Sequence, residues 1–68
     1  MSIGTSVDPE FFDDVCHFCE NENINYQVWN AADILLIPGT FAEMDFDTPE
    51  DFKKVIKFIR QLVINSVA

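Results

Sequence analysis

Residues 34–46 read ILLIPGTFAEMDF, an apolar run that is broken by Pro38-Gly39 and then alternates between apolar and polar positions. The Pro-Gly pair favours a tight turn, and the alternation is typical of a strand with one buried face. This stretch therefore predicts a β-hairpin, with one strand over residues 34–37 and the next over residues 40–46.

The segment before this hairpin predicts a third strand. Residues 24–30 alternate, and residues 30–33 read as a turn that places Val28 opposite Leu35 and Tyr26 opposite Ile37. In this register one face of the sheet is apolar and buried: Ile24, Tyr26, Val28, Leu35, Ile37, Ala42, Met44 and Phe46. The opposite face carries Gln27, Trp29, Ile34, Leu36, Phe41, Glu43 and Asp45.

A helix is predicted on each side of these strands. Asp8 and Pro9 are typical of a helix N-cap and first position, and the periodic pattern that follows fades near Asn21. Thr48 and Pro49 repeat this start for a last helix that runs to about Ser66. Residues 1–7 show no periodicity, so we expect a flexible arm.

These elements predict a single small α+β domain over residues 1–68, in the order α-β-β-β-α. The expected architecture is a three-stranded antiparallel meander with two helices packed on one face. A chain of this length buries a small core and gains from a partner subunit.

The sheet face away from the helices would then expose four large apolar side chains. Trp29, Ile34, Leu36 and Phe41 form this cluster, rimmed by Gln27, Glu43 and Asp45. An exposed cluster with aromatic residues at its centre is typical of a protein interface, so we expect a protein partner or a homodimer here. The alternative is that the last helix covers this face.

The charge of the chain is strongly asymmetric. Net charge is −8, residues 1–47 hold ten acids and no Lys or Arg, and all four bases lie between Lys53 and Arg60. Such a surface repels nucleic acid and membranes and attracts basic protein surfaces. The acidic residues expected to contact a partner are Asp13, Asp14, Glu20, Glu43 and Asp45. In size and charge the chain resembles phage-borne anti-restriction and anti-CRISPR inhibitors, which implies occupation of a basic nucleic-acid-binding surface on a host protein.

Cys16 and Cys19 form the one motif that could carry chemistry. Structural zinc takes four ligands, and the chain has one CxxC pair and one histidine, His17, on the opposite side of the helix. We therefore expect two buried apolar thiols and no metal or cofactor, with a metal shared across a dimer and a redox pair as alternatives. His17 lies among acids as a solvated residue, or alternatively acts as a base or pH switch. No catalytic signature is present, so we expect no enzyme.

Lys53-Lys54-Val55-Ile56-Lys57 opens the last helix with clustered lysines. In element order and in this lysine placement, the expected fold resembles the double-stranded-RNA-binding domain. The resemblance implies RNA binding as a minor alternative, which the acidic charge opposes.

No signal peptide or membrane span is evident, and two cysteines without a secretory signal favour a reducing compartment. We expect a cytoplasmic, non-enzymatic protein-binding module that acts as an inhibitor. The alternative is a homodimeric adaptor that assembles through the outer face of its sheet.

Overall fold

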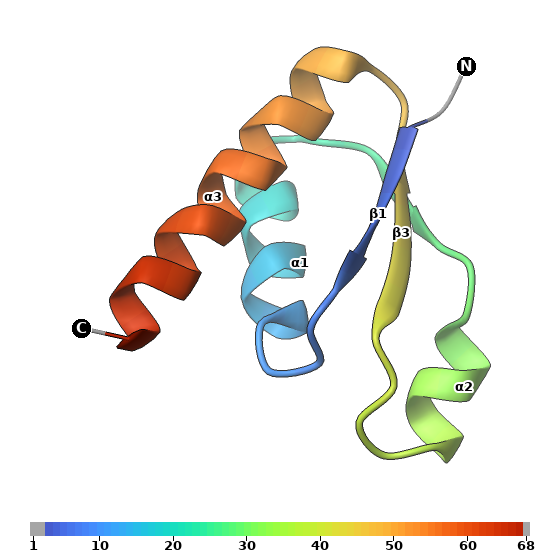
Figure 1. Ribbon diagram of the computed structural model, residues 1–68. Helices are drawn as coiled ribbons and strands as arrows, with labels where there is room; N and C mark the ends of the chain where they lie inside the picture. Colours follow the sequence, from blue (N-terminus) through green and yellow to red (C-terminus); the bar gives the residue numbers. More distant parts are fainter. Residues whose placement is uncertain (1–2, 68) are drawn as a thin grey trace.

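The computed structural model describes residues 3–67, in which strands and helices alternate along the chain (Figure 1). The elements are β1 (Ile3–Val7), α1 (Phe12–Asn21), β2 (Tyr26–Val28), α2 (Ala31–Leu36), β3 (Ala42–Phe46) and α3 (Pro49–Val67). The described chain is therefore a small α+β domain with a three-stranded antiparallel sheet. The expected α-β-β-β-α order is wrong, because the described part starts with a strand and has a helix between β2 and β3.

The last strand in sequence is the central strand in space. The order across the sheet is β1-β3-β2, and β3 pairs antiparallel with both neighbours. The edge strands β1 and β2 therefore run parallel to each other with β3 between them, and α1 connects them. This is a split β-α-β unit, so the expected meander is also wrong.

Residues 3–7 form β1, although a flexible arm was expected over residues 1–7. Residues 1 and 2 lie outside the described part. Thr5 is opposite Met44 and Val7 is opposite Ala42, so β1 adds Val7 to the core.

The expected strand over residues 34–37 is instead the end of α2 and the bend that follows it. The Ile37 amide donates to the Asp33 carbonyl at 2.8 Å, and Gly39 takes a positive φ of 81° in the turn that leads to β3. Ala and Leu favour helix over strand, which explains the outcome. The expected pairs are replaced, because Tyr26 lies opposite Phe46 and Val28 opposite Met44.

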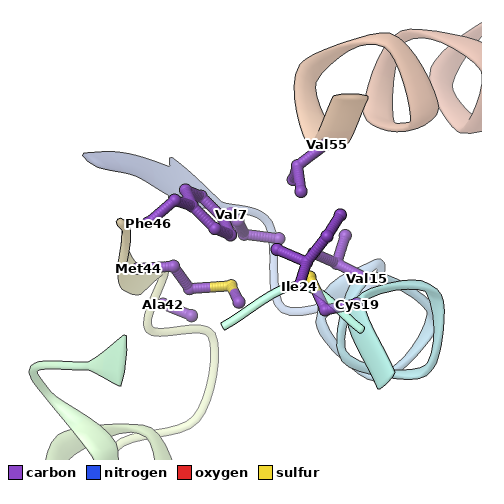
Figure 2. Packing of buried hydrophobic residues seen from close by; sticks show 8 residues of the cluster. All are labelled: Val7, Val15, Cys19, Ile24, Ala42, Met44, Phe46 and Val55. Atoms are coloured by element: carbon purple, nitrogen blue, oxygen red, sulfur yellow. The ribbon is translucent and has the colours of Figure 1, made fainter. Parts of the chain in front are cut away.

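Both long helices share one core with a single face of the sheet. Eight buried residues form this core: Val7, Val15, Cys19, Ile24, Ala42, Met44, Phe46 and Val55. Figure 2 shows the side chains of β3 directed toward those of α1, with Val55 of α3 above them. The rings of Phe18 and Phe58 stack at a centroid distance of 4.2 Å and join α1 to α3. The inward direction expected for Ala42, Met44 and Phe46 is confirmed.

The two predicted helix starts differ in outcome. The Thr48 hydroxyl accepts a hydrogen bond from the Asp51 amide at 3.2 Å, which confirms the cap of α3. Asp8 instead forms a turn before α1, since its carboxylate accepts from the Glu10 amide and its carbonyl from the Phe11 amide. This turn moves the start of α1 to Phe12.

Candidate protein-binding surfaces

The sheet face opposite the core is open to solvent. Strand alternation directs five side-chain positions of the sheet to it, and Trp29 follows directly after β2. We call this set the outer sheet face: Gly4, Ser6, Gln27, Trp29, Glu43 and Asp45. All are exposed except Asp45, which is half-buried. Because α1 and α3 pack on the opposite face, the alternative in which the last helix covers this surface is wrong.

Two of the predicted acidic residues lie together on this face. Glu43 and Asp45 are two positions apart on β3, so their carboxylates project from neighbouring positions. The Ser6 hydroxyl lies 2.9 Å from each carboxylate oxygen of Glu43 and donates to that group. Asp45 lies over Gly4, where a β-carbon would collide with its Oδ1 atom. Contacts with β1 therefore position both carboxylates.

Trp29 follows β2 and Phe41 precedes β3, so both lie at the end of the β2–β3 pair near the backbone of Glu43. The Trp29 amide donates to the Glu43 carbonyl at 2.9 Å. The Asn30 side chain continues the ladder, donating to the Phe41 carbonyl at 2.8 Å and accepting from the Glu43 amide at 2.9 Å. Trp29 is 68% exposed and Phe41 51% exposed. The two predicted aromatic residues are therefore both exposed near the end of the strand pair that carries Glu43.

The other two predicted apolar residues lie elsewhere. Ile34 and Leu36 belong to α2 and not to the sheet, so the expected four-residue cluster on one sheet face is wrong. Ile34 is half-buried and packs against the core, whereas Leu36 is 78% exposed. The cause is the helical conformation of residues 31–36, which replaces alternation by a period of 3.6 residues.

Sequence reasoning missed the exposed apolar residues that accompany Leu36. Leu35 and Ile37 were expected inside the core, but both are exposed, and we call Leu35, Leu36 and Ile37 the α2 patch. Leu35 also borders an apolar hollow of about 210 Å³ between α1 and α2, lined by Phe12, Val28, Ala31, Ile34 and Leu35. The Ala-Ala-Asp-Ile-Leu-Leu sequence was the signal that could have identified this helix.

The remaining predicted acidic residues face away from the outer sheet face. Asp13, Asp14 and Glu20 are exposed on α1, on the side opposite the buried Val15 and Cys19. Since α1 covers the core face of the sheet, these three carboxylates form a second acidic surface. The five predicted acidic residues therefore do not form one site.

The two thiols belong to the core layer. Cys19 is buried and Cys16 is half-buried. Burial, together with nearby Cys16 and two carboxylates, raises the pKa of the Cys19 thiol to about 11. Burial also raises the pKa of Cys16, which shares a hydrogen bond with Tyr26, and this bond and burial raise the pKa of Tyr26 to about 12. Thiolate formation is therefore disfavoured at neutral pH.

Within residues 3–67, no group of three or more His, Cys, Asp and Glu side chains is arranged to hold a metal ion. His17 is exposed on α1, as are the four bases Lys53, Lys54, Lys57 and Arg60 on α3. The lysines are where the resemblance to the double-stranded-RNA-binding domain placed them, but the element order that supported it is absent.

None of the helices in the described part of the chain has the length and apolar character that crossing a membrane requires. Comparison with protein-family models, with curated proteins and with solved structures gives no match to this chain.

Proposed function

We propose that this chain is a non-enzymatic module that binds a basic protein surface through its outer sheet face. The observation that carries the proposal is the position of Glu43 and Asp45 on the open face of β3, a strand at whose start the exposed Trp29 and Phe41 also lie. Carboxylates pair with Lys and Arg, and aromatic faces attract the guanidinium of Arg. A surface that combines both features suits a partner rich in arginine.

The partner class follows from the charge of the whole chain. Ten acids and no base over residues 1–47 create a negative field that favours encounter with cationic surfaces. Protein grooves that hold nucleic acid are surfaces of that kind, because they neutralise phosphates with Lys and Arg. The proposed activity is therefore inhibition, in which the chain occupies such a groove and excludes the nucleic acid.

The experiment uses the immobilised chain and the fraction of a cell lysate that heparin retains. We expect the immobilised chain to capture proteins from this fraction. Moderate salt or added duplex DNA should release these proteins, because salt ions and DNA compete for the same cationic side chains. A Glu43→Gln/Asp45→Asn variant should lose this capture. The matched Asp13→Asn/Asp14→Asn variant removes the same charge from α1 and should keep most of it. Capture that is unchanged by salt, by duplex DNA and by the Glu43→Gln/Asp45→Asn substitutions would refute the proposal.

A second candidate is a homodimer joined through the same face. It rests on the exposure of Trp29 and Phe41, since exposed aromatic residues are common at interface centres. Trp29→Asp should then halve the mass in solution measured by light scattering. An unchanged mass would exclude this interface.

A further inference from the structure

The exposed side of α3 carries a stripe of cationic residues that is followed by apolar residues. Its residues are spaced by four, three, four and three positions, which places them on one side of a helix: Lys53, Lys57, Arg60, Ile64 and Val67. All five are exposed. The first three are cationic, whereas Ile64 and Val67 are apolar and remain 58% and 79% exposed.

The C-terminal end of α3 is exposed in the described chain. Leu62 is the last residue that packs against the core, and residues 63–67 are all exposed. Figure 1 shows this end of α3 extending away from the sheet. Val63, Ile64 and Val67 are exposed close together at this end, and contiguous apolar patches mark interaction sites.

α2 carries the complementary stripe. Ile34 faces the core, so Asp33 and Leu36, three positions apart, lie together on the opposite side of this helix. Both are exposed, and Ile37 continues the apolar part. Along α2 an acidic residue is followed by apolar residues. Along α3 basic residues are followed by apolar residues, so the two stripes are complementary in the same direction.

We propose that the exposed stripe of α3 in one copy docks on α2 of a second copy. Arg60 then lies beside Asp33, and Ile64 packs against Leu36. The match in spacing supports this alignment, because each pair spans about one helical turn of 5.4 Å. The occupant is a second copy because α3 of the same chain carries the cationic and apolar side chains that complement Asp33 and Leu36 on α2.

The contact joins two different surfaces, so it is heterologous. The pair as a whole keeps one unused α2, on one copy, and one unused α3, on the other, and association therefore continues into longer assemblies or closes into a ring. The net charge of −8 opposes association at long range, but salt screens this repulsion while the local charges remain complementary. The contact uses neither Trp29 nor Glu43, so it is independent of the proposed function.

The test measures mass in solution by sedimentation velocity at physiological salt over a range of concentrations. The wild-type chain should increase in average mass with concentration. Leu36→Asp and Ile64→Asp should each weaken association by about tenfold or more, since each places a carboxylate in an apolar contact. Both residues are exposed, so the variants should fold, which circular dichroism checks.

Mixing the two variants is the decisive arm. The Ile64→Asp chain has an intact α2 and the Leu36→Asp chain an intact α3, so the mixture should form a dimer and stop there. A charge exchange adds a second check: Asp33→Arg and Arg60→Glu should each impair assembly, and their combination in one chain should restore it. Lys54→Ala, at an exposed position of α3 outside the stripe, is the control that should leave assembly unchanged.

Three results would overturn the proposal. The first is a wild-type chain that stays monomeric at every concentration. The second is an Ile64→Asp variant that associates like the wild type, which would indicate contact between two α2 helices. The third is a variant mixture that remains monomeric while the wild type associates.

Discussion

The carboxylate of Asp45 lies directly over Gly4 on the outer sheet face, in the space where a side chain at position 4 would be. A β-carbon there would also lie 2.8 Å from the Met44 carbonyl oxygen, which is backbone and cannot move independently. Gly4 therefore permits the close approach of β1 to β3.

We expect Gly4→Ala to lower the free energy of unfolding by about 1–3 kcal/mol, through crowding of β3. Urea denaturation measures the change. Asp45→Ala should recover part of the loss in the double variant, because it removes one of the two crowded groups. Gly39→Ala provides the contrast: it should cost about 1 kcal/mol through its positive φ, with no recovery from Asp45→Ala.

The Asn30 side chain should stabilise the end of the β2–β3 pair. Its amide donates to the Phe41 carbonyl, just before β3, and accepts from the Glu43 amide within β3. Asn30→Ala should therefore lower the free energy of unfolding by about 1–2 kcal/mol. Hydrogen exchange of the Glu43 amide should accelerate, since its acceptor is removed. Thr40→Ala, which removes a hydroxyl bonded only to the nearby Ile37 carbonyl, should leave that exchange rate unchanged.

Stability should fall at alkaline pH because the folded chain retains protons that the unfolded chain releases. The pKa of Cys19 rises from an ordinary value of 9.0 to about 11 in the folded protein, and the pKa values of Cys16 and Tyr26 rise as well. The corresponding stability is fully present below pH 9 and is lost as pH rises toward 11. Urea denaturation across this pH range measures the decrease in the free energy of unfolding. A Cys16→Ala/Cys19→Ala variant should show a smaller decrease.

The stacked pair Phe18 and Phe58 should couple α1 to α3. Their rings are nearly parallel, with an interplanar angle of 10°. A double-mutant cycle with Phe18→Leu and Phe58→Leu should give a coupling energy of about 0.5–1.5 kcal/mol. The same cycle with Phe18 and Phe52, whose ring packs against Phe46, should give a smaller value. Equal couplings would contradict a specific contribution from stacking.

The parts of the fold that local chemistry determines could be predicted from the sequence. The alternation of Ala42, Met44 and Phe46 fixes which face of β3 is buried, and the Thr48 hydroxyl fixes the start of α3. Glu43 was placed correctly on the open face for the same reason.

The sequence-based prediction of the fold is wrong where two local preferences compete, or where a strand pairs with residues far along the chain. Ile34-Leu35-Leu36-Ile37 is a short apolar run that suits a strand or a helix, and period alone does not separate them. Ile3, Thr5 and Val7 do alternate and are β-branched, but their partner strand lies far along the chain. The missing β1 and the extra α2 together changed the topology and divided the expected apolar interface.

The central position of β3 has a consequence for synthesis of the chain. Both edge strands bond only to β3, so neither β1 nor β2 has a pairing partner until residue 46 has left the ribosome. No strand pair of the described sheet can therefore form before β3 is available, and every pairing joins residues that are distant in sequence. A nascent chain that ends before residue 42 should show no amide protection in residues 3–7 or 26–28, and extension through β3 should protect both strands together.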